Sequence, residues 1–289
     1  MNKYVVSIVV VLSILVIVIG RYQYDQKLSN ISTSAQQLLS ETNEGSNEES
    51  VEGNQEVDEE NSEIESGANN EETELEDEMD ELMENVDPTI ANKISSSLTE
   101  GESISILAFG SRSLTDSQDE GLNPWPKLLE DKLNEAYETD AFEVETMSVG
   151  EMTSLEMIRQ DVHQEVAEMD ADIYILEPLL WNDNGQVSMD HSTDHISMLI
   201  DAITAANPEA VVILNPSQPA YNTINYPIQI EGLRNFANDN DYLYIDHWNE
   251  WPEITDEELT DYVDEDDHRM PLQSGHELWS DSVLSKFVN

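Results

Sequence analysis

The chain has 289 residues, no cysteine, and 63 acidic against 11 basic side chains, which gives a formal net charge of -52. Such a charge argues against a nucleic-acid partner, because binding to phosphate backbones needs clustered Lys and Arg. The absence of cysteine excludes disulfides, zinc–thiolate sites, iron–sulfur clusters and thiol nucleophiles. Because the sequence also lacks metal-ligand motifs such as a D-x-D-x-D-G calcium loop, we expect neither a metal nor a cofactor.

The acidic residues are spread over two regions of different character. Residues 31–100 carry 22 acids and one base, whereas residues 101–289 carry 40 acids and seven bases. Repulsion among the many acidic side chains of residues 101–289 would destabilise a folded domain in low salt, and salt ions would relieve it by screening. The sequence therefore predicts a source organism that is salt-loving or alkali-tolerant.

The N-terminus begins with an apolar segment, Tyr4–Gly20, which has no charged residue and lies between Lys3 and Arg21. Its length is short for a membrane-spanning helix and long for the core of a signal peptide. No small-x-small cleavage site follows it directly. We therefore expect an uncleaved, single-pass signal anchor over residues 1–22 in the cell membrane, with the remaining chain outside the cytoplasm. A cleaved signal peptide is the alternative.

Residues 23–85 are predicted to form an acidic, disordered linker, because this composition buries too little apolar surface to offset chain entropy. Within residues 73–86, Leu75, Met79, Leu82 and Met83 have helical spacing, which allows a short amphipathic helix before the folded domain. The folded domain itself is expected over residues 86–289.

Strand and helix signals alternate within this domain. Short apolar runs predict strands at residues 104–109, 142–149, 173–176, 211–214 and 242–245. Helical spacing predicts helices at residues 125–137, 155–169, 191–206, 228–240 and 275–288. Such alternation indicates an α/β fold, in which a parallel sheet carries helices on both faces. Ligands of these sheets bind beyond the carboxyl ends of the strands.

The loops at those strand ends contain residues that could carry chemistry. After the first strand, Ser111 and Ser113 could each present a hydroxyl as a nucleophile. After the second strand, the backbone N–H of Gly150 could approach a developing oxyanion, and after the third strand the side-chain amide of Asn182 could do the same. Each of these segments is also compatible with a simple turn.

Two acid-and-histidine segments follow near the C-terminus. Asp267 precedes His268, and Gly275 precedes His276 at the predicted start of the last helix. An acid close before a histidine can orient the imidazole as a general base for a serine.

The order of these segments resembles the SGNH (GDSL-type) hydrolase superfamily over about residues 100–289. Ser148-Val149-Gly150 is similar to its second block, Asn182-Asp183 to the N-D of its G-x-N-D block, and Pro271 with Gly275-His276 to its last block. The resemblance implies a three-layer, flavodoxin-like fold and serine esterase or acyl-hydrolase chemistry. It also implies that a serine is the nucleophile, that Gly150 and Asn182 form the oxyanion hole, and that an Asp–His pair supplies the base.

The first block departs from the family pattern. Arg112 stands two residues after Gly110, where the family's nucleophile normally lies. Ser113 matches the nucleophile if one residue is inserted, and Ser111 matches it if the turn is shortened.

The last block departs as well, because Met270 stands at the place of the family's catalytic histidine and Asp267 at the place of its acid. A two-residue insertion would make His268 the base, with Asp264 or Glu265 behind it. His276 and His247 are the other candidates.

Two functions remain open from the sequence. The first is a membrane-tethered esterase or acyl hydrolase acting outside the cytoplasm on a small-molecule or glycan ester, such as an acylated cell-surface glycan. The second is a catalytically degenerate module that binds glycans or serves as a scaffold. Five tryptophans could line a sugar platform in that case, or could instead pack in the core or at the edge of the domain, at positions Trp125, Trp181, Trp248, Trp251 and Trp279.

Overall fold

The structure is a computed structural model that describes residues 79, 81–264, 266 and 270–289. These residues belong to one compact unit, residues 63–289. The predicted membrane anchor, most of the acidic linker, and the candidates Asp267 and His268 therefore lie outside the described residues. Within the described part of the chain, no helix has both the length and the apolar character needed to cross a membrane.

Five parallel strands form one sheet in the order β2-β1-β3-β4-β5. Their bounds are β1 (Ile104–Gly110), β2 (Phe142–Ser148), β3 (Ile173–Leu176), β4 (Val211–Leu214) and β5 (Leu243–Tyr244). In the register, Phe109 of β1 pairs with Met147 of β2 on one side and with Leu176 of β3 on the other. The loops that follow β1, β2 and β3 therefore meet at one edge of the sheet.

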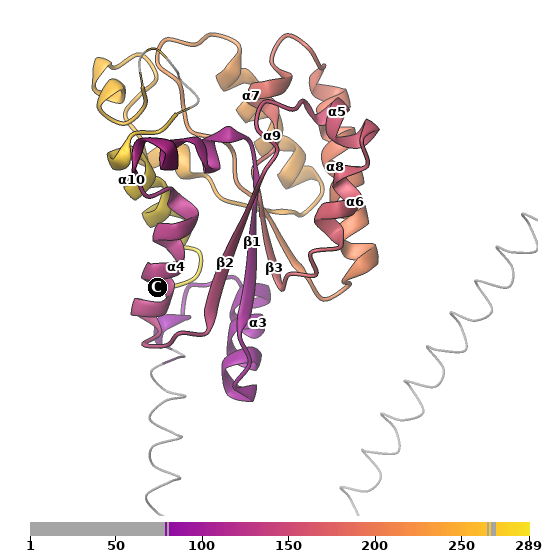
Figure 1. The fold of residues 1–289 in the computed structure, drawn as a ribbon, viewed down its shortest axis with the longest axis vertical. Helices are drawn as coiled ribbons and strands as arrows, with labels where there is room; N and C mark the ends of the chain where they lie inside the picture. The colour runs from indigo at the N-terminus through magenta and orange to yellow at the C-terminus, as the bar shows by residue number, and fades with distance from the viewer. Residues whose placement is uncertain (1–78, 80, 265, 267–269) are drawn as a thin grey trace, which may run out of the picture. The chain divides into compact units, whose positions relative to one another are not determined.

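Helices cover both faces of the sheet (Figure 1). One face carries α3 (Pro88–Glu100), α4 (Trp125–Ala136) and α10 (Gln273–Leu284), and the other carries α5 (Ser154–Arg159), α6 (Val162–Ala167), α8 (Met189–Ala206) and α9 (Tyr226–Asp239). The loops contain short helices, namely η1 (Arg112–Leu114), η2 (Asp116–Glu120), α7 (Leu180–Asp183), η3 (His247–Glu250) and η4 (Glu257–Asp261). This arrangement confirms the predicted three-layer, flavodoxin-like α/β fold.

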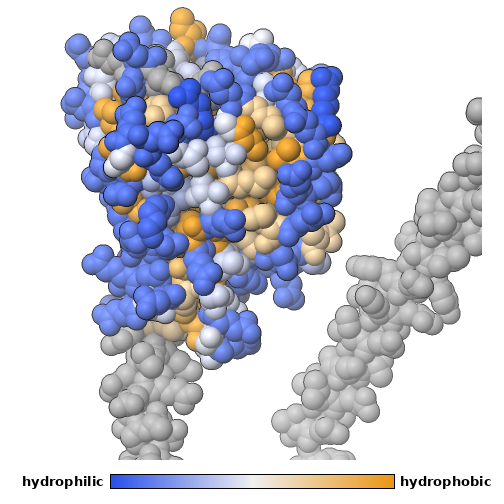
Figure 2. Space-filling view, in the orientation of Figure 1, coloured by the Kyte–Doolittle hydropathy of each residue, from blue (hydrophilic) through white to orange (hydrophobic). Residues whose placement is uncertain are grey.

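The two layers bury separate hydrophobic clusters because side chains alternate across β1. Ile106 and Ala108 face the α3/α4/α10 layer, whereas Leu107 and Phe109 face the α5/α6/α8/α9 layer. Almost all side chains of the central strands β1, β3 and β4 are buried, so these strands consist almost entirely of apolar residues. The outer surface is mainly hydrophilic in the face that Figure 2 shows, as the acidic composition requires.

Aromatic stacking strengthens the first of these layers. Trp125 of α4 stacks on Trp279 of α10 with ring centroids 5.4 Å apart, and His247 stacks on the same indole at 4.9 Å. Trp125, Trp251 and Trp279 are buried. These three tryptophans are core residues and do not line a sugar platform.

Several elements differ from the sequence-based expectation. The predicted helix 155–169 is two helices, α5 and α6, because Asp161 adopts a left-handed conformation (φ 59°) between them. Helix α3 was not expected, although Asp87 caps it by accepting a hydrogen bond from the Thr89 N–H. Met83, just before the predicted start of the domain, is buried in the first cluster.

Candidate active site

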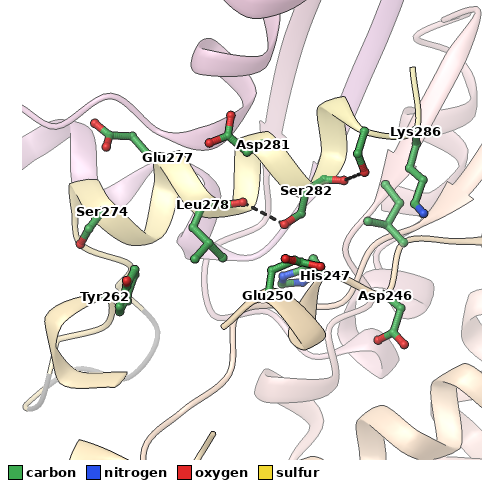
Figure 3. Close-up of a pocket in the computed structure, with 12 residues that line it drawn as sticks. Asp246, His247, Glu250, Tyr262, Ser274, Glu277, Leu278, Asp281, Ser282 and Lys286 are labelled. Atoms are coloured by element: carbon green, nitrogen blue, oxygen red, sulfur yellow. Dashed lines mark hydrogen bonds between the residues drawn. The ribbon is translucent and has the colours of Figure 1, made fainter. Parts of the chain in front are cut away.

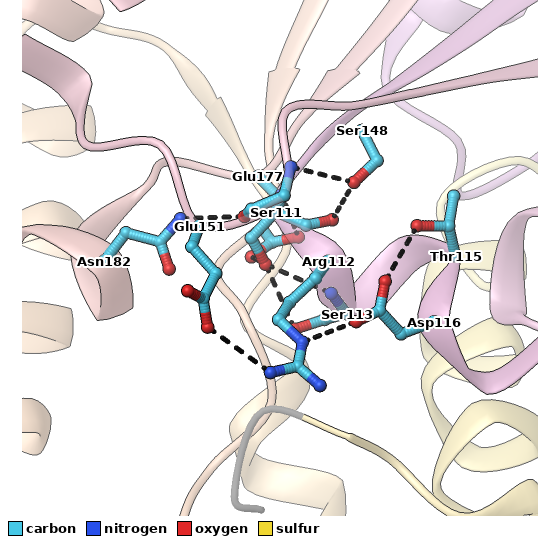
Figure 4. Close-up of polar contacts among 10 residues, drawn as sticks. Ser111, Arg112, Ser113, Thr115, Asp116, Ser148, Glu151, Glu177 and Asn182 are labelled. Atoms are coloured by element: carbon cyan, nitrogen blue, oxygen red, sulfur yellow. Dashed lines mark hydrogen bonds and ion pairs between the residues drawn. The ribbon is translucent and has the colours of Figure 1, made fainter. Parts of the chain in front are cut away.

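Two buried serines lie directly after β1. Ser111 follows Gly110 and caps η1, its Oγ accepting a hydrogen bond from the Ser113 N–H at 3.3 Å. The Oγ atoms of Ser111 and Ser113 are 3.1 Å apart, within hydrogen-bonding distance. Both residues are only 2% exposed. The structure thus brings the two candidate nucleophiles together in one hydrogen-bonded pair (Figure 4).

A glutamate that the sequence analysis did not single out completes this pair. Glu177 follows β3, and its carboxylate accepts hydrogen bonds from Ser111 Oγ at 2.7 Å and from the Ser111 N–H at 3.2 Å. Ser217, which follows β4, donates its hydroxyl to the same carboxylate. Burial raises the pKa of Glu177, although the hydrogen bonds from Ser217 and Ser111 oppose that effect.

The two candidate oxyanion donors lie beside this loop but have partners within the protein. The Gly150 N–H donates to Ser148 Oγ at 3.2 Å, and Ser148 Oγ donates to the Ser111 carbonyl at 2.8 Å. Asn182 Nδ2 donates to the carbonyls of Gly150 at 3.0 Å and Met152 at 2.9 Å. Ser111, Gly150 and Asn182 therefore lie close together, with their donors directed at protein acceptors.

Arg112 fills the position that the family pattern assigns to the nucleophile. Its N–H donates to the Gly150 carbonyl at 3.1 Å, which ties the β1 and β2 loops together. Its guanidinium pairs with Asp116 at 2.6 Å and with Glu151 at 3.4 Å. A guanidinium stays charged at every physiological pH and has no lone pair for attack, so Arg112 is not a nucleophile.

The described C-terminal histidine candidates are engaged elsewhere. His276 is buried between α10 and α4, where its Nδ1 accepts a hydrogen bond from the Trp125 N–H at 3.2 Å, and burial lowers its pKa to about 4. Both ring nitrogens of His247 are occupied, Nε2 by the Pro216 carbonyl at 2.7 Å and Nδ1 by Trp251 Nε1 at 2.9 Å. Burial lowers the pKa of His247 to about 4 as well.

No histidine among the described residues is hydrogen-bonded to Ser111 or Ser113. His268 and its partner Asp267 lie outside the described residues and remain a prediction, as does Glu265. Met270, which stands at the family's histidine position, is described, and its carbonyl accepts from the Asp264 N–H at 3.1 Å.

A second polar cluster lies behind Asn182. The neighbouring Asp183 is fully buried and accepts hydrogen bonds from the Ser154 N–H at 2.8 Å, from Ser154 Oγ at 2.6 Å and from Ser192 Oγ at 2.6 Å. His195 Nδ1 lies 2.8 Å from Ser154 Oγ. His195 is only 9% exposed. The cluster joins α5, α7 and α8 and so fixes the backbone that carries Asn182.

A cavity of about 700 Å³ lies between η3 and α10 (Figure 3). Acidic side chains line much of it, namely Asp246, Glu250, Glu277 and Asp281. Neither serine contributes to its lining, so this cavity is separate from the serine pair. Among the described residues, no group of three or more His, Asp or Glu side chains could hold a metal ion.

Comparison with known proteins found no matching family model and no matching curated protein. Solved structures do match. A putative GDSL-like lipase from Parabacteroides merdae superposes with a TM-score of 0.53 at 9% identity, covering 64% of this chain and 96% of that one. A carbohydrate esterase of family 3 from Talaromyces cellulolyticus superposes with a TM-score of 0.51 at 14% identity, covering 63% of this chain and 95% of that one.

A putative lipolytic protein of the G-D-S-L family from Desulfitobacterium hafniense gives a TM-score of 0.50 at 16% identity, covering 63% of this chain and 98% of that one. The domain therefore has the SGNH/GDSL hydrolase fold, which the order of its sequence blocks predicted. A fold by itself does not assign a reaction, so the function has to be argued from the site.

Proposed function

We propose that the domain is a serine esterase that hydrolyses acyl esters. The observation that supports this best is the convergence of the Ser111 and Ser113 hydroxyls with Gly150 and Asn182 at the carboxyl edge of the sheet. Ligands of parallel sheets bind at this edge. The solved structures that share the fold include a carbohydrate esterase and putative lipases, which is the chemistry that this set of groups would serve.

Ser113 is the better nucleophile of the two. The Ser111 hydroxyl is directed at Glu177, whereas Ser113 Oγ contacts only Ser111 Oγ among the hydrogen bonds of the described residues. In this mechanism Ser113 Oγ attacks the acyl carbonyl carbon, and the Gly150 N–H and Asn182 Nδ2 exchange their present acceptors for the oxyanion. If the last block carries a two-residue insertion, the family resemblance would make His268 the base, with Asp264 or Glu265 behind it.

The substrate that we propose is an acylated glycan at the cell surface, outside the cytoplasm. The charge-free segment Tyr4–Gly20 supports a membrane attachment through a single N-terminal helix, and the carbohydrate esterase among the fold relatives supports a glycan ester. The strongly acidic domain repels polyanions, which favours a neutral glycan or a small neutral ester as substrate.

Hydrolysis of p-nitrophenyl acetate by the purified full-length chain, measured over a range of salt concentrations, tests this proposal. We expect turnover by the wild type and a loss of about 10²-fold or more when Ser111 and Ser113 are both changed to alanine. The matched control is Ser280→Ala, which removes an equally buried hydroxyl from α10, away from the site. Absence of turnover by the wild type at every salt concentration would refute the proposal.

A second candidate function is ester or glycan binding without catalysis. The specific observation in its favour is that Arg112 holds the expected nucleophile position while both serines are only 2% exposed. Calorimetric titration with acetylated xylan separates the two readings. Binding by a chain that never turns over p-nitrophenyl acetate would favour the second one.

A further inference from the structure

The three side chains Ser113, Ser111 and Glu177 form a continuous hydrogen-bonded chain. Ser111 Oγ lies 2.7 Å from Glu177 Oε1 and 3.1 Å from Ser113 Oγ. A hydroxyl has one proton to donate and two lone pairs that accept. When Ser111 donates to Glu177, the remaining contact therefore requires Ser113 to donate to Ser111. The proton of the proposed nucleophile thus points toward a carboxylate through one intervening hydroxyl.

The groups around the Glu177 carboxylate can all donate hydrogen bonds to it. Its described hydrogen-bond partners are the Ser111 N–H, Ser111 Oγ and Ser217 Oγ, all of which can donate. No Lys or Arg in the described residues forms an ion pair with Glu177. The residue is 1% exposed, and a carboxylate removed from water binds a proton more tightly than an exposed one.

The space for this carboxylate depends on a glycine. A Cβ placed on Gly110 would lie 2.4 Å from Glu177 Oε2, so only glycine at the end of β1 allows the carboxylate to reach the Ser111 loop. A buried carboxylate without a cationic partner is costly to maintain, and a role in proton transfer would explain why an acid rather than an amide lies here.

We propose that Glu177 is the proton acceptor for Ser113, with Ser111 as the relay between them. This inference rests on the esterase function proposed above and names its base. As Ser113 Oγ forms its bond to the acyl carbon, its proton moves to Ser111 Oγ and the proton of Ser111 moves to Glu177 Oε1. The bond from the acyl carbon to the alcohol oxygen then breaks. Because Ser113 Oγ is now acylated, the alcohol oxygen takes its proton from Ser111 Oγ, which regains one from Glu177.

Hydrolysis of the acyl-enzyme uses the same relay in the second half of the reaction. Water attacks the acyl carbon and gives one proton to the relay as its oxygen forms the new bond. The bond to Ser113 Oγ breaks, and Ser113 regains its proton from Ser111, which regains its own from Glu177. The carboxylic acid product leaves and Glu177 returns to its ionised form, so that atoms and protons balance.

The test compares Glu177→Gln with Asp172→Asn in the full-length chain. Asp172 is the matched control because it accepts hydrogen bonds from the N–H and Oγ of Ser105, as Glu177 does from Ser111, but it does so at the amino-terminal edge of the sheet. We expect E177Q to lower kcat for p-nitrophenyl acetate by about 10²-fold or more, with little change in KM. D172N should keep kcat within about threefold of the wild type.

Wild-type kinetics supply a second measurement in case E177Q does not fold. The acid limb of the kcat/KM profile should not shift when the temperature is raised, because a carboxylate ionises with almost no enthalpy change, whereas an imidazole limb moves to lower pH on warming. An acid limb that moves to lower pH on warming would overturn the assignment of Glu177 as the proton acceptor.

The possible failures are distinguishable. Full activity of E177Q would overturn the role of Glu177 while the esterase function stood, most clearly if His268→Ala were inactive. Absence of turnover by the wild type would overturn the esterase function and this inference with it.

Discussion

Replacing Gly110 by alanine is expected to destabilise the domain through Glu177. The added Cβ would lie 2.4 Å from Glu177 Oε2 and 2.6 Å from Glu177 Cβ, against 3.4–4 Å for ordinary contacts. Glu177 would have to retreat by about 1 Å in a packed interior. Rotation of the side chain cannot achieve this, because Cβ is fixed to a backbone whose N–H donates to the Phe109 carbonyl at 2.7 Å.

The expected loss of stability has two parts. Overpacking of this kind costs about 1–3 kcal/mol. Loss of one hydrogen bond to the carboxylate adds about 1.5–3 kcal/mol. Together they lower the free energy of unfolding by about 2.5–6 kcal/mol. The same displacement separates Glu177 from Ser111, so esterase activity should fall with it.

Urea unfolding of the full-length chain, followed by tryptophan fluorescence, measures this loss. Gly232→Ala in α9 is the matched control, because its Cβ would meet the flexible end of Met189, with Cε at 3.2 Å. G232A should stay within about 1 kcal/mol of the wild type, since alanine also favours the helix. A G110A variant as stable as G232A would refute the packing argument.

Three further predictions concern stability. Thr153→Ala removes the capping box that Thr153 forms with Glu156 and should lower the free energy of unfolding by about 1 kcal/mol in urea melts. Burial opposes the ionisation of Asp172, but hydrogen bonds from Ser105 and Lys93 lower its pKa. Its stabilisation is therefore present above the pKa of the unfolded chain and is lost as pH falls through the folded-state pKa. Asp172→Asn should accordingly cost about 1–2 kcal/mol at neutral pH and less at acidic pH, as thermal melts across pH would show. Because residues 101–289 carry 40 acids and seven bases, added NaCl should raise Tm, and a Tm that is flat or falling would contradict the self-repulsion argument.

The sheet was predictable because its central strands are buried on both faces. Ile104–Gly110, Ile173–Leu176 and Val211–Leu214 read as apolar runs in the sequence and are β1, β3 and β4 in the structure. The break at Asp161 was not predictable, since the apolar spacing continues through it and only the left-handed backbone divides the helix. Helix α7 was missed because its four residues are too few to show a helical period.

The sequence was enough to predict where in the fold the candidate site lies, but not which side chains form hydrogen bonds within it. Position at strand ends was enough to bring Ser111, Gly150 and Asn182 together, because a parallel sheet gathers those ends at one edge. Glu177 was missed because its role depends on which hydroxyls it contacts, and the sequence does not show that Ser111 and Ser217 lie next to it. The signal was present in the sequence as an acid that directly continues the buried strand Ile173–Leu176, where the pairing of Phe109 with Leu176 sets it beside the Ser111 loop.

The ends of the described chain meet at a single point, far from the serines. The Asn289 N–H donates to the Leu82 carbonyl at 2.7 Å, and both residues lie beside Tyr137, where α4 ends and the chain turns back toward the start of β2. The serine pair lies at the opposite end of the strands. An immobilising tag or fluorescent fusion at the C-terminus would thus emerge from this end of the domain, and would leave the opposite end, with the serine pair, open to a large polymer.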